Sequence, residues 1–306
     1  MKKTMKKTIF IALAALLSLP FGAAAQEAVD SPSSSVAMPF LSIPRETKSL
    51  SMAGSDLFGG ASSMLRDGSR LSAGASYLKW MGSGVTPYGC VNADVAYNTG
   101  GNVAVKAFIS IDKGSEYELI TEDGTPGETY SPNNMVVGAN VAFAFTKEVA
   151  ADVTVKRISQ SIAPDASFSA FAADVILSAK LPVGVKLAGG VKALGTPVKE
   201  GVKKYSLPMS AVVSAGYANA FSDSFALDAE ALVEYYMYGA LRASAGVEAE
   251  IVKMVYVRGG YNLGLGDSLL PSFASAGLGV KYSMVKAELA YATLFNTISL
   301  GVRVDL

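Results

Sequence analysis

Five acidic side chains on two neighbouring segments are the first candidates for chemistry. Asp228, Glu230 and Glu234 share one face of a segment with alternating polarity, and Glu248 and Glu250 share one face of the next. Paired carboxylates of this kind can transfer protons or bind a cation. Because Arg and Lys recur on the polar faces of other segments, we expect these acids to form a network of ion pairs instead.

The composition excludes most catalytic arrangements. The 306 residues include no His, so imidazole cannot serve as base, nucleophile or ligand. Cys90 is the only cysteine, which excludes an intrachain disulfide and a multi-cysteine metal site. The 26 basic and 26 acidic residues leave no basic footprint for nucleic acid. A Ser–Lys dyad remains formally possible. We therefore predict that the chain is not an enzyme, with no catalytic, cofactor-binding or metal site, no cofactor and no nucleic-acid partner.

Two loops could bind a partner. Residues 113–132 carry five acidic side chains and one Lys, which could attract a metal or a basic partner, although a solvated acidic loop is the simpler interpretation. Residues 263–271 are apolar and could contact lipid, a hydrophobic ligand or another protein. Folding of that loop back into a barrel mouth is an equal alternative. The Gly259–Gly260 pair precedes no helix and indicates tight packing or a strand kink rather than a phosphate loop.

The first 25 residues have the pattern of a secretory signal peptide. Four lysines precede an apolar stretch at 9–19, and three alanines at 23–25 supply a cleavage site before Gln26. Residues 26–67 then form a leader that we expect to dock as a plug, although a disordered tether is an equal alternative for 26–35.

From residue 68 to residue 306 the hydrophobic pattern has a period of two. In 297–306, for example, Ile, Leu and Val alternate with Thr, Ser, Gly, Arg and Asp. Strict alternation over this length indicates half-buried strands. Each segment has roughly the ten residues that a tilted strand needs to cross a bilayer. We expect about 14 strands, at 69–80, 86–98, 102–112, 133–146, 149–160, 167–180, 184–194, 206–219, 224–237, 239–251, 253–263, 272–282, 284–294 and 295–306.

The connections between these strands sort by parity. Every connection after an even-numbered strand is tight, whereas the long ones, such as 113–132 and 195–205, follow odd-numbered strands. Bacterial outer-membrane barrels have short periplasmic turns and longer external loops, and a soluble sandwich has no reason to separate them. The parity therefore favours a membrane barrel.

Three observations indicate that the apolar face points outward. Fourteen strands enclose a lumen too wide to be filled as a dry core, which suits an interior lined by charge. The opposite face is rich in Ala, Val, Leu and Ile, as expected against lipid. Aromatic residues also gather near strand ends, where Tyr and Trp favour the headgroup level. The inward charges are Asp94, Lys106, Asp174, Lys186, Asp228, Glu230, Arg258, Lys286, Glu288 and Arg303. The aromatic residues are Tyr77, Trp80, Tyr97, Phe145, Tyr217, Tyr235, Tyr261 and Tyr282.

These patterns predict an all-β fold: a closed antiparallel transmembrane β-barrel of about 14 strands with an N-terminal plug-like segment, located in a bacterial outer membrane. Closure is required because an open sheet edge in hydrocarbon leaves backbone groups unsatisfied. The apolar final residue, Leu306, resembles the C-terminal signal of such barrels, where Phe is more usual. Cys90 is expected to be a small residue near the rim.

Residues 40–54, FLSIPRETKSLSMAG, resemble the N-terminal signature of the PorV/PorQ proteins within the FadL-like barrel superfamily. Residues 77–81, YLKWM, also resemble the Tyr-x-x-Trp-Leu segment of that family. The chain departs from the family at 61–65, where an Asn-Pro-Ala motif is often found, and in its Met-Ala-Gly turn. The resemblance covers about a fifth of the chain.

The resemblance implies a 14-stranded outer-membrane barrel. It also implies one of two functions. PorV-like members act as shuttle or scaffold subunits of type IX secretion, so secretion-system proteins or secreted cargo would be partners. FadL-like members pass hydrophobic molecules, so a hydrophobic ligand would be the partner, with outer-membrane lipid around the barrel in either case. We take the secretion role as the leading hypothesis and the transporter as the alternative, which requires an apolar pocket beside residues 36–67 and a lateral opening.

Overall fold

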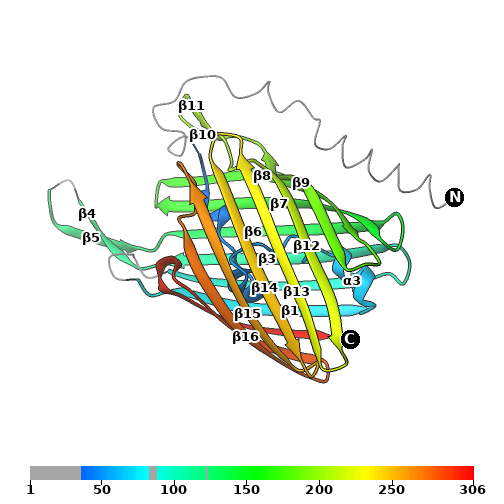
Figure 1. Ribbon diagram of the computed structural model, residues 1–306. Coiled ribbons are helices and arrows are strands. Elements are labelled where there is room, and N and C mark those ends of the chain that lie inside the picture. Colours follow the sequence, from blue (N-terminus) through cyan, green and yellow to red (C-terminus); the bar gives the residue numbers. More distant parts are fainter. Residues whose placement is uncertain (1–35, 83–87, 122) are drawn as a thin grey trace.

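The computed structural model describes residues 36–82, 88–121 and 123–306 (Figure 1). The expected signal peptide and residues 26–35 of the leader lie outside these ranges. The wall consists of fourteen strands. Their bounds are β1 (Leu71–Trp80), β2 (Tyr88–Asn98), β3 (Val103–Gly114), β6 (Asn133–Ala144), β7 (Val149–Ala163), β8 (Ala166–Lys180), β9 (Val185–Gly195), β12 (Ser210–Ser222), β13 (Phe225–Tyr236), β14 (Leu241–Ile251), β15 (Val255–Leu265), β16 (Phe273–Tyr282), β17 (Val285–Ala292) and β18 (Thr297–Asp305).

The strands form one closed antiparallel ring, in which β1 pairs with β18. At this seam the N–H groups of Arg70 and Leu71 donate to the carbonyl of Leu306, and the Leu306 N–H donates to the Leu71 carbonyl at 2.7 Å. Closing the ring pairs both edge strands, as strands in hydrocarbon require. The predicted all-β barrel of fourteen antiparallel strands is confirmed.

The apolar face points outward, as the charged positions, the composition of the opposite face and the aromatic residues predicted. Arg303 turns into the barrel and pairs with Asp94 at 2.9 Å, while the neighbouring Val302 is 50% exposed on the outside. Likewise Glu248 pairs with Arg258 inside, and Val247 faces outward. All ten charged residues expected to line the interior take part in ion pairs there.

The connections divide the barrel into two ends. When only the fourteen wall strands are counted in chain order, the connections after every second strand are short. They are 99–102, 145–148, 181–184, 223–224, 252–254 and 283–284. The connections at the opposite end include 115–132, 196–209 and 266–272. We call these the turn end and the loop end, and both β1 and β18 have their outer termini at the turn end. The predicted parity is therefore confirmed.

Two small hairpins at the loop end differ from the sequence-based expectation. The acidic loop contains β4 (Tyr117–Ile120) paired with β5 (Pro126–Tyr130), which projects away from the barrel in Figure 1. Residues 196–209 contain β10 (Val198–Glu200) paired with β11 (Lys203–Tyr205). The expectation of a strand over 206–219 was wrong at its start, because 206–209 turn inward and β12 begins at 210.

Aromatic side chains form two bands on the outer surface. The turn-end band contains Tyr97, Phe143, Tyr217, Phe225 and Tyr282, and the loop-end band contains Tyr77, Phe171, Tyr235, Tyr261 and Tyr291. The expectation that Trp80 lies at the headgroup level on the outer surface was wrong. Its ring lies on the inner face and stacks on Tyr88 at 4.3 Å between centroids, with Phe295 at 4.7 Å.

Residues 36–67 lie inside the barrel and run from the loop end to the turn end. They include a 3-10 turn, η2 (Pro39–Ser42), and two short helices, α2 (Thr47–Ser51) and α3 (Ser62–Asp67). Helix α2 packs on β1 and β15–β18, and α3 packs on β2, β3, β6 and β7. No helix in the described ranges is long and apolar enough to cross a membrane.

Four inward glycines make room for this internal segment. A Cβ on Gly260 would lie 2.4 Å from the Met52 carbonyl carbon, and one on Gly277 would lie 2.4 Å from Ser51 Cβ. Gly246 and Gly301 similarly contact Met52 and Thr47. The internal segment therefore lies closer to these wall strands than any side chain at the glycine positions would permit. This confirms the interpretation that Gly260 marks a site of tight packing.

Candidate functional site in the barrel interior

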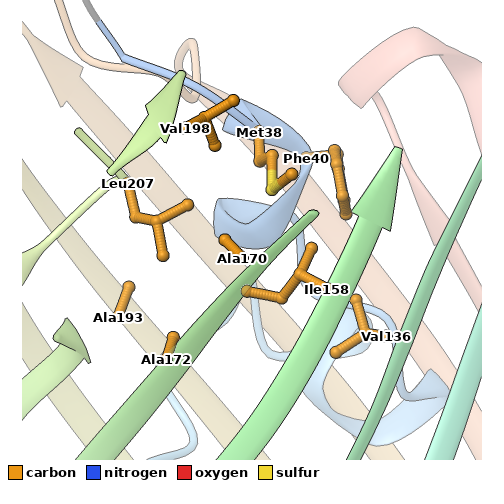
Figure 2. Close-up of a cluster of buried hydrophobic side chains, with 9 residues drawn as sticks. All are labelled: Met38, Phe40, Val136, Ile158, Ala170, Ala172, Ala193, Val198 and Leu207. Atoms are coloured by element: carbon orange, nitrogen blue, oxygen red, sulfur yellow. The ribbon is translucent and has the colours of Figure 1, made fainter. Parts of the chain in front are cut away.

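The loop end of the interior is filled by apolar side chains. The first group, the Met38 cluster, consists of buried Met38, Phe40, Val136, Ile158, Ala170, Ala172, Ala193, Val198 and Leu207. Figure 2 shows Met38 and Phe40, on the segment drawn in blue, beside wall strands that carry Ile158 and Val136. Val198 and Leu207 reach the same cluster from residues 196–209. Three separate parts of the chain thus meet in one apolar contact.

A second group, the Leu50 cluster, fills the other side of the loop end. It contains Leu50, Ala53, Leu78, Cys90, Leu270, Phe273, Ala290, Ala292 and Leu294. Leu270 is 2% exposed, so the loop at 263–271 folds back into the mouth at this residue. Leu263 and Leu265 belong instead to the outward face of β15. Cys90 lies two residues from the loop-end start of β2, near the rim as expected, and it is buried in this cluster.

Below the clusters lies a charged cavity of about 800 Å³ between the internal segment and the wall. It extends to the turn end, where Lys281 and Asp305 line it. Its described lining holds ten basic and ten acidic side chains. The basic ones are Arg45, Lys48, Arg66, Lys106, Lys156, Lys180, Lys186, Lys281, Lys286 and Arg303; the acidic ones are Glu46, Asp56, Asp94, Asp174, Asp228, Glu230, Glu248, Glu250, Glu288 and Asp305.

Four of the five acidic residues singled out from the sequence form ion pairs in this interior. Lys186 pairs with both Asp228 and Glu230, and the ring of Phe58 lies 4.7 Å from the same ammonium. Arg258, fully buried, joins Glu248 to Glu288. Glu234 belongs to a second network, and Glu250 lines the cavity without an ion pair among the described residues. The predicted network is therefore present for four of the five acids. Within the described residues, no group of three or more His, Cys, Asp and Glu is placed to hold a metal ion.

A second network ties the wall to the internal segment. Arg242 donates through Nε to Glu234 at 2.8 Å and through a terminal nitrogen to the Gly54 carbonyl at 3.2 Å. Gly54 adopts φ +70° just after α2, and a side chain there would meet the Pro44 ring. Lys192 and Ser210 complete the shell around Glu234. A wall arginine thus holds the turn that ends α2.

Arg45 and Glu46 anchor the segment on the opposite wall. Arg45 donates to Asp112 at 2.8 Å, to Ser110, and to the Phe40 carbonyl at 3.2 Å. Glu46 accepts from Lys106 at 2.9 Å and lies 3.9 Å from Arg303. Enclosure in the barrel opposes ionisation of Glu46, but the charges of Lys106 and Arg303 outweigh it, and the net result is a lowered pKa.

This lowered pKa predicts how the anchor responds to acid. The stabilisation from Glu46 is complete above the ordinary glutamate pKa, about 4.5, and is lost as pH falls through the lower folded-state value. We expect Glu46→Gln to reduce the free energy of unfolding by less than about 1 kcal/mol at pH 7, because the carboxylate is half exposed. The difference should shrink as the pH falls below about 4.5 in a urea-unfolding series from pH 8 to pH 3. A difference that grows with acidity would contradict the assignment.

The wall is irregular beside the Met38 cluster. The register between β8 and β9 shifts between Ala173 and Val175. Asp174 leaves the ladder pairing and accepts from the Ala193 N–H at 2.7 Å and from Lys156. Ala193, on β9, has φ 55°. On its other side β9 pairs with β12, but only over the residues from Lys192 toward the turn end. The ladder is therefore interrupted at Asp174, where a side-chain carboxylate replaces backbone pairing, and it resumes toward the loop end at Ala173–Leu194 and Ala172–Gly195.

Sequence reasoning placed the charged lining but not the apolar clusters. Met38 and Phe40 were seen only as an apolar stretch in the leader, and their wall partners are small or branched residues on strands that otherwise point charges inward. The signal available was the interruption of inward charge at Val136, Ile158, Ala170 and Ala172, where the polar face of β6–β8 becomes apolar toward the loop end.

A closed ring of fourteen antiparallel strands, apolar outside and charged inside, is the architecture of a bacterial outer-membrane protein. No protein-family model matches the chain, and no curated protein matches it in sequence. Solved structures do match in fold. The CymD monoaromatic hydrocarbon channel is 11% identical with a TM-score of 0.58, over 86% of this chain and 98% of that chain.

Two further neighbours have the same fold. The Pseudomonas putida toluene transporter TodX is 12% identical, with a TM-score of 0.56 over 85% of this chain and 97% of that one. A Pseudomonas aeruginosa FadL homologue is 11% identical, with a TM-score of 0.51 over 86% and 99%. The FadL-like barrel fold implied by residues 40–54 therefore agrees with these neighbours. None of the three is a secretion protein, so the PorV/PorQ resemblance stays a prediction.

Proposed function

We propose that this chain is a non-enzymatic channel for small hydrophobic molecules in the outer membrane, with residues 36–67 as its plug. The observation that carries the proposal is the Met38 cluster. Met38 and Phe40 occupy an apolar pocket at the loop end of a lumen that is otherwise charged, inside a barrel whose fold is similar to hydrocarbon channels. These observations favour the transporter, which is the alternative hypothesis from the sequence, over the secretion role.

The pocket has the chemistry to receive an aromatic hydrocarbon. Val136, Ile158 and Ala170 present apolar surface that Met38 and Phe40 now cover. A hydrophobic solute that displaced those two side chains would recover about 25 cal/mol for each Å² of apolar surface buried. When the solute enters, its apolar contacts replace those of Met38 and Phe40. The free-energy cost of displacing these two side chains is therefore small.

The charged cavity is a poor next step for such a solute. Although Leu41, Phe58 and Phe108 also line it, its described lining holds ten acidic and ten basic groups, and an apolar molecule would compete with their hydration. The irregular seam beside Ala172 and Ala193 borders the Met38 cluster directly. We therefore propose that the solute leaves laterally between β8 and β9 toward lipid, which is the opening that the transporter hypothesis requires.

Uptake of toluene into cells tests the proposal. In a Gram-negative host without its own hydrocarbon channel, we expect the protein to raise initial toluene uptake at least about tenfold and leave arabinose uptake unchanged. Ile158→Asn should abolish the gain, because it places an unpaired amide in the apolar pocket. Val202→Ser, at an almost fully exposed hairpin residue, is the matched control. Heat-modifiable migration in gels verifies that each variant forms the barrel.

Equal uptake of toluene with and without the protein would refute the channel. Recovery of secretion components with the solubilised barrel, together with that result, would support the secretion role instead.

A further inference from the structure

Charge on the lipid-facing surface of the barrel is confined to three basic residues. Among outward-facing positions in the described wall strands, only Lys79, Lys113 and Arg157 are ionisable apart from tyrosines, and none is acidic. The interior, by contrast, has equal numbers of acids and bases. No ion pair within the described ranges involves any of these three cations.

All three cations lie at the same height, near the loop end. Counted from the turn end, Lys79 and Arg157 are each eight residues into their strands, after Leu71 and Val149, and Lys113 is ten residues after Val103. At about 3.3 Å per residue and a tilt near 40°, these positions are roughly 20 to 26 Å above the turn end. The apolar band of such a barrel is about 25 Å tall, so the cations are at its upper edge.

The loop-end aromatic band confirms this height. Lys79 lies two residues beyond Tyr77, and Arg157 is directly cross-strand from Phe171, which is 58% exposed. Aromatic bands mark the interface between hydrocarbon and headgroups. Because short turns face the periplasm in bacterial barrels, the loop end faces outside, and the three cations meet the headgroups of the outer leaflet.

Lys79 and Lys113 flank Gly89. Both pair directly with it, from opposite sides, so all three residues share one face and the two lysines are two strand spacings apart, about 9.6 Å. The Tyr77 ring lies over Gly89, because a Cβ there would be 3.1 Å from the Tyr77 hydroxyl and 3.4 Å from a ring carbon. The absent side chain therefore lets the phenolic hydroxyl lie between the two lysine positions.

We propose that this face binds a phosphate-bearing glycolipid of the outer leaflet, with one phosphate on the Tyr77 hydroxyl between Lys79 and Lys113 and a second anionic group beside Arg157. Phosphate oxygens accept hydrogen bonds from ammonium, guanidinium and hydroxyl groups. The lipid's acyl chains lie along the apolar side chains below, such as Val91, Ile111 and Val137. The inference is independent of what passes through the lumen.

Native mass spectrometry of the detergent-solubilised, full barrel tests the site. The probes are a bis-phosphorylated hexa-acyl glycolipid, the same glycolipid without phosphates, and inorganic phosphate. Each basic group near an anionic surface contributes about fivefold in affinity, so the triple variant K79Q/K113Q/R157Q should bind the bis-phosphorylated lipid roughly a hundredfold more weakly. Lys147→Gln/Lys253→Gln, in two exposed turns of the opposite end, is the control that removes two positive charges away from the site, and it should bind as wild type.

Gly89→Val provides a second test that changes no charge. A valine side chain would push the Tyr77 hydroxyl out of its place between the two lysines. Binding of the bis-phosphorylated lipid should then weaken about tenfold if a phosphate accepts from that hydroxyl, whereas diffuse attraction to a basic surface would be unaffected. Wild-type binding by the triple variant, equal binding of the lipid without phosphates, or retention of inorganic phosphate in place of the lipid would each overturn the proposal. Heat-modifiable migration shows whether the variants keep the closed barrel.

Discussion

Replacing Gly260 by valine is expected to open the barrel to small ions. The valine Cβ would lie 2.4 Å from the carbonyl carbon of Met52, and its partners there are backbone atoms that cannot rotate away. The turn at Met52–Ala53 must therefore leave the wall, and it takes with it the contacts of α2 and the Arg242–Gly54 hydrogen bond. In planar bilayers we expect a protein that conducts little as wild type to show stable open channels as the variant, with conductance raised by at least about an order of magnitude.

The adjacent glycine is a matched control. Gly259 faces outward on the same strand, and the nearest atom to a Cβ there is the Ser275 carbonyl oxygen at 3.9 Å. Gly259→Val adds the same side chain and should leave conductance at the wild-type level. If both variants conduct alike, strand flexibility and not the internal segment controls the opening.

Replacing Arg258 by glutamine is expected to destabilise the barrel more than any other single change in the charge network. Its guanidinium is fully buried and is shared by Glu248 and Glu288, from β14 and β17. Without it, Glu248 loses its ion pair with Arg258, and Glu288 keeps only its pair with Lys286 at 3.3 Å. Removal of one member of a buried charge group costs about 3–5 kcal/mol. Urea unfolding in lipid vesicles should show a loss of that size.

Lys281→Gln serves as the comparison for Arg258→Gln. Lys281 also lines the cavity, on the neighbouring β16, but it is half-buried near the turn end and enters none of the ion pairs among the described residues. Its loss should change the free energy of unfolding by no more than about 0.5 kcal/mol. Similar losses in both variants would mean that net lumenal charge, and not the Arg258 pairing, sets stability.

The barrel wall could be predicted because a spanning strand must satisfy two solvents at once. Ile298, Leu300 and Val302 alternate with inward residues because one face meets lipid and the other meets water and charge, so the period of two continues for the whole strand. The tight connections also fixed the orientation of strands, since a two-residue turn such as 223–224 leaves no freedom in pairing. These constraints act between residues that are close in the sequence, so they can be recognised in a single sequence.

The interior arrangement could not be predicted in the same way. Met38 and Phe40 have buried partners more than ninety residues away, on four wall strands and on 196–209, and no local period records such contacts. Residues 206–209 continue the apolar character of β12, which made them resemble strand, although Leu207 in fact turns into the Met38 cluster. Trp80 was assigned to the lipid interface on residue type, while the parity of β1 places it inside beside Tyr88.

The cavity lining carries ten acidic and ten basic side chains, and this balance of charge has a consequence for the cell. Fixed charges of one predominant sign would repel mobile ions of that sign and so act as a filter, but an electrically balanced passage repels neither potassium nor chloride. Any leak through this protein would therefore be indiscriminate. Osmotic protection of the periplasm at this site depends on tightly packed methyl, thioether and phenyl groups at the outer mouth, and selection for a good seal should act there.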